Sequence, residues 1–160
     1  MKKLDLAKVP LKAGSIYPPP YAEQMEGRSS LRLGQAAGLT QFGVNLVTLK
    51  PGALSSLRHW HQAEDEFVLM ISGECVMVTD DGEEIMRQGD CAGFPANTPD
   101  GHHFINRGDT PAVFLVVGAK AREEVVTCSD VDLVLTLKDG IATYTHKDGR
   151  PYAPEGEDHG

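Results

Sequence analysis

The sequence predicts an all-β fold, and three observations carry this prediction. Apolar residues fall into short runs of five to nine residues, shorter than a typical helix. Turn-forming sequences rich in Gly, Pro, Asp and Asn separate these runs. Valine, threonine and aromatic residues, which favour pleated structure, are frequent within the runs. The spacing of runs and turns predicts about ten strands arranged as a sandwich or barrel.

Residues 1–30 precede the predicted strands. They mix Lys and Gly with the run Pro18, Pro19 and Pro20. Because proline fixes its φ angle and lacks a backbone N–H donor, this composition disfavours regular structure. We therefore predict an irregular N-terminal arm over residues 1–30.

Residues 31–146 are predicted to form a single domain with one core, since a chain of 160 residues can bury most of its apolar surface. The turns between its strands are LKPGA, MISGE, TDDGEE, RQGD, NRGDTP and LKDG. The predicted strands include, in order, FGVNLVTL, EFVLMI, ECVMVT, EEIMR, AVFLVVG, EEVVTC, VDLVLTL and IATYTH. Residues 147–160 are rich in Gly, Pro and acid and are predicted to form a flexible tail, with His146 and His159 exposed to solvent.

Composition excludes several classes of partner. A formal net charge of -8 disfavours binding to nucleic acid and to anionic membranes, so a small molecule is the expected partner. Cys75, Cys91 and Cys128 are odd in number and form no CxxC motif, which argues against a disulfide framework or a thiolate zinc site. They are expected to be small core residues. The sequence shows no signal peptide and no apolar run of about 18 residues, so we expect a cytoplasmic protein.

The segment RHWHQAEDEF, residues 58–67, holds the densest group of candidate metal ligands. On a strand, His59 and His61 point to one side and Trp60 to the other. Glu66 opens the next predicted strand, and antiparallel pairing would bring it in front of both imidazoles. Two imidazoles and a carboxylate suit a divalent first-row ion such as Zn, Fe, Mn or Ni, in a site that needs at least one more ligand.

A fourth ligand is expected from PANTPDGHHFIN, residues 95–106, which carries His102 and His103. Adjacent residues on a strand face opposite sides, so only one of the two histidines can join the first pair. The alternative for the HxH pair alone is a surface strand with two solvated histidines, because this short pattern is common. Glu64 and Asp65 are expected to be solvated turn residues rather than ligands.

Trp60 is expected to pack on the outer face of a sheet or at a subunit contact, because its ring buries a large area and its single donor needs one partner. It is therefore not a candidate for chemistry.

Two segments resemble the paired motifs of the cupin superfamily. GALSSLRHWHQAEDEFVLMISG, residues 52–73, resembles the first motif, with a glycine, HxH, a glutamate after four further residues and a glycine after six more. GDCAGFPANTPDGHHFIN, residues 89–106, resembles the second motif, with a glycine, a proline after five residues, and a histidine and an asparagine separated by three. The resemblance covers about residues 40–118. The first motif has six rather than five residues between Gly52 and His59, and the loop after Pro95 is longer than usual.

The resemblance implies a double-stranded β-helix, in which two antiparallel sheets close into a small cupin jelly-roll barrel around one divalent ion. The ligands that it implies are His59, His61, Glu66 and His102. It favours His102 over His103 because the family's histidine stands four positions before the asparagine, here Asn106. The longer loop leaves this choice open. The resemblance also implies a homodimer, since small cupins usually pair.

The predicted chamber around the ion is mostly apolar and suits a small ligand with one chelating polar end. Candidate substrate-contacting or ligand-supporting residues are Met70, Met77, His103, Phe104 and Asn106. We expect a metal-dependent, dioxygenase-like enzyme, with a non-catalytic ligand-binding or sensing protein as the alternative. A sugar or sugar-phosphate isomerase is a further alternative, although no Lys or Tyr can be placed in the chamber as an acid or base. No catalytic residue is predicted beyond the metal ligands.

Overall fold

The computed structural model describes residues 3–152, which fold into thirteen strands and three short helical segments. The helical segments are the 3-10 turns η1 Leu6–Lys8 and η2 Ala22–Met25 and the single-turn helix α1 Leu33–Ala36. The strands are β1 Leu11–Ala13, β2 Arg28–Arg32, β3 Phe42–Leu49, β4 His59–His61, β5 Glu66–Ser72, β6 Glu74–Thr79, β7 Gly82–Arg87, β8 Cys91–Phe94, β9 His103–Ile105, β10 Ala112–Ala119, β11 Glu123–Cys128, β12 Val134–Lys138 and β13 Ile141–Thr145. The all-β prediction is confirmed.

These strands form three antiparallel sheets. The largest has the order β1-β2-β3-β10-β5-β8, and a three-stranded sheet has the order β7-β6-β9. The two sheets enclose the main core, which is built around buried Phe104, Phe114 and Met70. Strand β5 shows the alternation that pleating requires, because Val68 and Met70 are buried while Phe67 and Ile71 are exposed.

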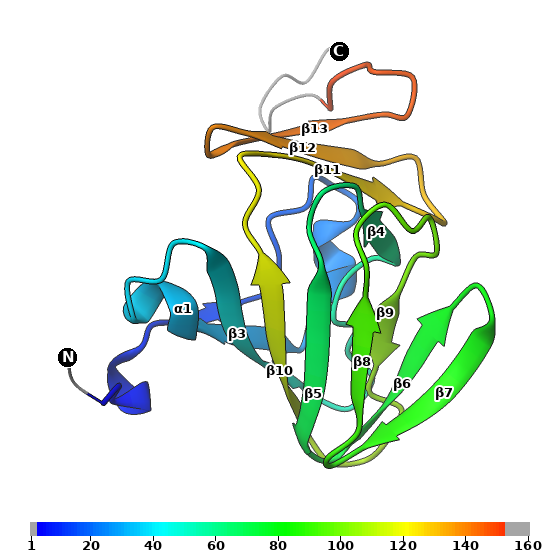
Figure 1. Cartoon of the computed structure of the whole chain (residues 1–160). Coiled ribbons are helices and arrows are strands. Elements are labelled where there is room, and N and C mark those ends of the chain that lie inside the picture. The colour runs from blue at the N-terminus through cyan, green and yellow to red at the C-terminus, as the bar shows by residue number, and fades with distance from the viewer. Residues whose placement is uncertain (1–2, 153–160) are drawn as a thin grey trace.

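The third sheet lies across one end of the barrel, with the order β13-β12-β11-β4 (Figure 1). A second apolar cluster lies beneath it, centred on buried Met25, Leu57, Cys128 and Leu133. Strand β4 belongs to this sheet, pairing His61 with Val126 and His59 with Cys128. The candidate metal ligands on β4 therefore lie where the barrel meets the covering sheet.

The prediction of no regular structure in residues 1–30 is wrong for two stretches. Strand β1 pairs with β2, placing Leu11 opposite Leu31, and β2 continues the sheet through β3. The edge of β3 offers backbone groups that β2 satisfies, and β1 then satisfies the free edge of β2, so this pairing outweighs the local composition. The run Pro18–Pro20 itself lies outside the strands, as its missing donors require.

The first part of the predicted tail is ordered against the covering sheet. The Tyr152 hydroxyl donates to the backbone carbonyl of Asp132 over 2.5 Å, and the Tyr152 ring stacks on His146 with a centroid distance of 4.2 Å. His146 is half-buried and its Nδ1 lies 2.9 Å from Asp132 Oδ2, so the expectation of a solvated side chain is wrong. The rest of the predicted tail, including His159, lies outside the described residues.

The three cysteines divide by strand parity. Cys75 and Cys128 are buried, as expected for core residues. The expectation of a core residue is wrong for Cys91, which is exposed because it occupies an outward position on the edge strand β8. No helix within residues 3–152 is long and apolar enough to span a membrane.

Candidate metal centre

Backbone pairing brings the two histidine segments together. An isolated antiparallel bridge joins His59 and His102: the His59 N–H donates to the His102 carbonyl over 3.2 Å, and the His102 N–H to the His59 carbonyl over 2.9 Å. Glu66 arrives from β5, whose first residue lies opposite Phe94 of β8. Three separate segments therefore deliver side chains to one place.

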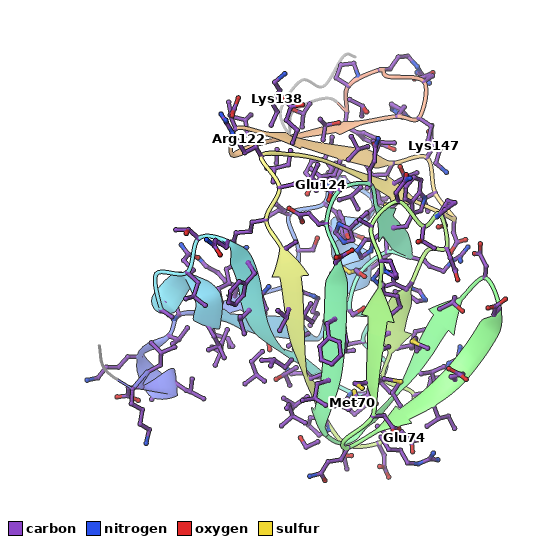
Figure 2. All side chains as sticks on the ribbon, in the orientation of Figure 1. Met70, Glu74, Arg122, Glu124, Lys138 and Lys147 are labelled. Carbon is purple, nitrogen blue, oxygen red and sulfur yellow. The ribbon has the colours of Figure 1, made fainter. Side chains whose placement is uncertain are left out.

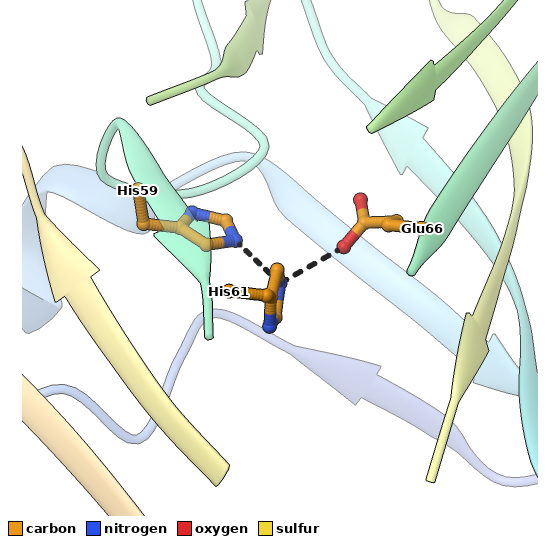
Figure 3. Close-up of side chains that lie close together, drawn as sticks. All are labelled: His59, His61 and Glu66. Atoms are coloured by element: carbon orange, nitrogen blue, oxygen red, sulfur yellow. Dashed lines mark hydrogen bonds and ion pairs between the residues drawn. The ribbon is translucent and has the colours of Figure 1, made fainter. Parts of the chain in front are cut away.

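Four side chains converge at the end of the barrel. His59 Nε2 lies 3.2 Å from His61 Nε2, and His61 Nε2 lies 3.2 Å from Glu66 Oε2 (Figure 3). His102 Nε2 lies 3.5 Å from the other oxygen of the same carboxylate, Glu66 Oε1. The donor atoms of His59, His61 and Glu66 all lie within 4.8 Å of one another, the separation expected of ligands that share one ion. The predicted approach of Glu66 to both imidazoles of β4 is therefore confirmed.

Hydrogen bonding to the backbone selects the tautomer of His59. Its Nδ1–H donates to the carbonyl of Leu57 over 2.8 Å, so the lone pair lies on Nε2 and faces the site. For His61 the remote nitrogen, Nδ1, lies 3.7 Å from Glu124 Oε2, a distance at which the carboxylate attracts an Nδ1–H without a full hydrogen bond. Both rings thus present Nε2 to the site, the arrangement that outer partners impose on metal-binding histidines.

Glu124 was not among the predicted site residues. It is 3 % exposed and its carboxylate accepts hydrogen bonds from the backbone N–H groups of Gln62, Ala63 and Val125 at 2.7–3.0 Å. It lies where β11 meets the end of the barrel (Figure 2). On β11, Val126 pairs with His61, and Glu124 lies two residues before Val126. Residues two apart on a strand share a face, so the Glu124 side chain is directed to the same side as Val126, beside the His61 imidazole. In the segment EEVVTC, Glu124 alternates with the same side of the strand as Cys128, which was expected to be a core residue. An acidic residue on the core side of a predicted strand was therefore the signal that could have identified Glu124.

Glu64 is also closer to the site than expected. It is half-buried, its Oε1 accepts from the Ala121 N–H over 2.8 Å, and it forms a second group of potential metal-binding atoms with His61 and Glu124. The expectation of a solvated turn residue is therefore wrong for Glu64. Asp65 is exposed, and its side chain accepts from the Ala96 N–H over 2.8 Å.

Burial and charge set the protonation of the cluster. Burial lowers the pKa of His59 to about 4, which keeps this imidazole neutral. Burial also acts to lower the pKa of His61, but the hydrogen bond to Glu66 and the charges of Glu66 and Glu124 outweigh it and raise the pKa. Burial opposes ionisation of Glu66, yet its contacts with His102 and His61 hold the pKa of this carboxyl well below its usual range. The site therefore combines neutral imidazole with an ionised carboxylate.

One buried nitrogen atom supports a cation at this point. His102 Nε2 lies on the side of the ring that faces Glu66, yet it is buried and makes no hydrogen bond to the described residues. Buried polar atoms are nearly always paired, so such atoms indicate a missing partner. Imidazole nitrogens facing an ionised carboxylate fit a divalent first-row ion, and these residues suit the ion that the sequence predicts.

The structure places His102, rather than His103, beside the other candidate ligands. The His102 ring is 2 % exposed and stacks on Phe94 with a centroid distance of 3.6 Å. The His103 ring turns to the opposite side of the chain, where its Nδ1 lies 3.1 Å from the carbonyl of Ser56. Strand alternation explains the difference, since the two residues are adjacent.

Most residues predicted to surround the ligand lie elsewhere. Met77 lines the cleft beside the site, but Met70 contacts Cys75 in the core, and Phe104 packs against Phe114 with a centroid distance of 5.2 Å. The prediction that Asn106 orients bound water or a ligand is wrong. Its Nδ2 donates to the carbonyls of Leu49 and Thr110, and its Oδ1 accepts from Gly108 N–H. The backbone therefore uses the polar groups of this side chain.

A cleft of about 350 Å³ opens onto the site. His61 and His102 lie in its wall, together with Phe94 and Trp60. Trp60 was expected to pack on an outer face, but it borders the cleft. The cleft is also lined by the carboxylates of Asp81, Glu83, Glu84 and Asp100, and none of its lining residues is Lys or Arg. Fold and site together define a small antiparallel β-barrel protein with a His/Glu candidate metal site at one end.

The chain belongs to the cupin superfamily. The model of the cupin domain matches residues 45–118. A sugar phosphate isomerase from a cupin superfamily, from Silicibacter pomeroyi, is 51% identical in sequence with a TM-score of 0.92, and the match covers 96% of this chain and 98% of that one. The predicted family and its double-stranded β-helix fold are thereby confirmed.

Two further solved structures are similar. A candidate sugar phosphate isomerase from Acidithiobacillus ferrooxidans is 27% identical with a TM-score of 0.71, covering 80% of this chain and 81% of that one. A polyketide cyclase from Streptomyces resistomycificus is 21% identical with a TM-score of 0.59, covering 74% of this chain and 79% of that one, and it supports the fold alone. A comparison with functionally curated proteins found no match.

Proposed function

We propose that the protein is a metal-dependent isomerase that acts on a sugar or a sugar phosphate. The observation that carries this proposal is the 51% identity, over nearly the full length of both chains, with a cupin named a sugar phosphate isomerase. The second relative, at 27% identity, bears a related name. These relatives favour the isomerase over the dioxygenase-like enzyme that the sequence first suggested.

The site can supply what an aldose–ketose isomerisation needs. A bound divalent ion polarises a carbonyl group and lowers the pKa of a neighbouring hydroxyl. His59, His61, Glu66 and His102 would hold the ion. Glu124 orients the imidazole of His61, and Phe94 fixes the ring of His102 by stacking. Trp60 and Met77 contribute apolar surface to the cleft, which the carbon-bound hydrogens of a sugar could contact.

The charge of the cleft favours an unphosphorylated sugar. A phosphate ester would bring about two negative charges to a cleft lined by no Lys or Arg and by four acidic residues, of which only Glu83 is paired with a cation among the described residues. The nearby cation Arg107 is already bound by both oxygens of Glu83, at 2.5 and 2.7 Å. Repulsion between the phosphate and the acidic residues of the same cleft disfavours binding of a phosphate ester, and water screens this repulsion only partly.

The proposal is tested by assaying the purified protein after loading with Zn, Fe, Mn or Ni in turn. We expect metal-dependent conversion of an aldose to its ketose, followed by NMR, with kcat/KM for the free sugar at least about tenfold above that for its phosphate ester. Turnover of no sugar by protein with a full complement of metal would favour the non-catalytic ligand-binding alternative. Consumption of dissolved oxygen by the iron-loaded protein in the presence of substrate would instead support the dioxygenase-like enzyme.

A further inference from the structure

The proposed isomerisation requires a group that moves a proton between adjacent carbon atoms. The residues that would hold the ion are committed to it, and Glu124 is held by three backbone N–H groups. A separate acid or base must therefore face the substrate. The β6–β7 hairpin forms one wall of the cleft and contributes Met77 and Thr79 from β6 and residues 82–84 from β7.

Strand parity aims Glu84 toward the interior of the barrel. Glu84 on β7 pairs with Met77 on β6, and two residues along the ladder Met86 pairs with Cys75. Met86 and Cys75 are 5 % and 1 % exposed and belong to the main core. Residues two apart on a strand share a face, so Glu84 stands on the core-facing side of β7, above the buried pair and at the open end of the barrel.

Glu84 has no partner of its own among the described residues. The neighbouring acid Glu83 has the opposite parity and pairs with Arg107, and Glu74 at the far end of the hairpin pairs with Arg87 over 3.0 Å. Within residues 3–152, no hydrogen bond or ion pair involves the carboxylate of Glu84. Glu84 is exposed where the cleft opens to solvent, so its carboxylate is free to contact a bound substrate.

We propose that Glu84 is the acid–base residue of the site, an inference that rests on the isomerase function proposed above. Its carboxylate takes the proton from C2 of the aldose, the C2–H bond pair forms the C1–C2 double bond, and the π pair of the C1 carbonyl moves to its oxygen, which takes a proton from solvent water. The C2 hydroxyl then gives its proton to solvent water and becomes the ketone carbonyl, while the C1–C2 π pair takes the proton back from the Glu84 carboxyl at C1, which leaves the ketose. The C2–H bond breaks and a C1–H bond forms, so atoms and electrons balance without a further reactant. His61 and His102 border the same cleft, so a substrate carbonyl beside them lies within the space that Glu84 faces.

The test compares Glu84→Gln with Glu74→Gln, a control on the same hairpin whose carboxylate pairs with Arg87 and does not line the cleft. Both variants keep the size of the side chain, and neither removes a predicted metal ligand. We expect Glu84→Gln to lower kcat by about 100-fold to 10,000-fold, to stop incorporation of solvent deuterium at C1 of the ketose, and to leave metal stoichiometry unchanged. Glu74→Gln should stay within about twofold of the wild type, because its exposed ion pair with Arg87 contributes little. Glu84→Asp should recover part of the rate.

Three outcomes would overturn the role of Glu84. Turnover by Glu84→Gln within about tenfold of the wild type would show that another group moves the proton. Isomerisation by the wild type without any deuterium incorporation over many turnovers would leave the isomerase standing but indicate direct hydrogen transfer between the carbons. Absence of turnover in the metal-loaded wild type would remove both the isomerase and the role of Glu84.

A second observation concerns the outer face of the six-stranded sheet. One continuous row of aligned residues crosses all six strands and consists of Leu11, Leu31, Leu46, Leu115, Leu69 and Cys91. Every other outward position on these strands, in the ranges given above, is also uncharged. Leu11, Phe67 and Ile71 are 66 %, 43 % and 41 % exposed, and no helix or loop crosses in front of β10, β5 and β8 (Figure 1).

The size of this outer face matches what a stable pair of chains needs. Six strands at about 4.8 Å spacing and roughly six residues each give a face of about 24 Å by 20 Å, or on the order of 500 Å². Two such faces would bury roughly 1,000 Å², the size at which specific interfaces begin. A face with no charged position offers nothing that selects a charged partner, whereas it is complementary to itself across a twofold axis. We infer that a second copy of this chain covers it.

Sedimentation equilibrium at about 20 µM tests this inference. The wild type should have twice the 17.3 kDa mass of the chain, and the double variant Phe67→Lys/Ile71→Lys should have the mass of one chain. Ile141→Lys is the matched control, since Ile141 is 70 % exposed on β13, away from this face, and it should remain dimeric. A monomeric wild type, or a double variant that stays dimeric, would overturn the inference.

The thiol of Cys91 gives a second measurement that needs no variant. Burial raises the pKa of Cys75 to about 12 and that of Cys128 to about 11, so Cys91 is the cysteine that should react. Its alkylation should slow as the protein concentration rises through the range in which chains pair. A rate that is independent of concentration would contradict pairing through the outer face.

Discussion

Replacing His61 with alanine is expected to abolish stoichiometric metal binding. His61 contacts two other proposed ligands, because its Nε2 lies 3.2 Å from His59 Nε2 and 3.2 Å from Glu66 Oε2. Loss of an outer partner of a metal ligand typically costs 10-fold to 100-fold in affinity, so loss of a ligand should cost at least about 1,000-fold. Elemental analysis after dialysis should fall from about one ion per chain to below about a tenth.

Thermal unfolding provides an independent reading of the same prediction. Metal at about 100 times its dissociation constant stabilises the folded wild type by about 2.7 kcal/mol, which for a chain of this size raises Tm by roughly 5–10 °C. The His61→Ala protein should show no such rise at the same metal concentration. A rise equal to that of the wild type would place the ion somewhere else.

His103→Ala is the matched control for this experiment. His103 is adjacent to the proposed ligand His102 but faces the Ser56 carbonyl, so its removal should leave the metal content and the thermal rise close to those of the wild type. If His103→Ala lost the metal while His102→Ala kept it, the ligand set would have to be revised. The pair of variants therefore decides the choice that the sequence left open.

The sequence was sufficient to predict the first half of the site. Alternation along a strand places His59 and His61 on one side, and the short connection to β5 brings Glu66 in front of them, so local geometry alone fixes three of the four side chains. The choice between His102 and His103 depends on which of them bridges to His59, a contact between residues 43 positions apart. Parity rules cannot supply it because they do not fix the start of β9.

The residues that the sequence did not identify depend on pairing between distant strands. Glu124 reaches His61 only because β11 pairs with β4, and Glu84 faces the cleft only because its register with β6 places it opposite Met77. A shift of either register by one residue would turn these carboxylates to the other face. The same limitation explains β1, whose pairing with β2 outweighs a composition that locally predicts an irregular arm. For Asn106 the sequence predicted the direction of the side chain, toward the interior of the barrel. It did not predict the backbone carbonyls to which this side chain donates, because they belong to distant or looped parts of the chain.

Replacing Asn106 with alanine is expected to destabilise the protein by about 3–5 kcal/mol and to lower Tm by roughly 6–20 °C. Asn106 is 0 % exposed, and its side chain ties the loop before β10 to the end of β3 through the carbonyls of Leu49 and Thr110 and the N–H of Gly108. Alanine would leave the buried Leu49 carbonyl without this donor, which costs about 1–3 kcal/mol, and would remove two part-buried hydrogen bonds to Thr110 and Gly108, each worth about 0.5–1.5 kcal/mol. Asn45→Ala, at a half-buried position on β3, should cost less than about 1.5 kcal/mol.

Metal content separates this structural role from a role at the site. Below its melting temperature, the Asn106→Ala protein should retain one ion per chain and most of its turnover, because the Asn106 side chain makes its hydrogen bonds to the backbone and not to any metal-site residue. Chemical unfolding at 25 °C measures the lost stability directly, with an unchanged m-value expected if the same surface is exposed on unfolding. A variant that unfolded like the wild type but lost its metal or its turnover would restore the role in binding that the sequence first suggested. The geometry argues against that outcome, since both Nδ2–H donors of Asn106 are bound to backbone carbonyls and the side chain is fully buried, away from the cleft.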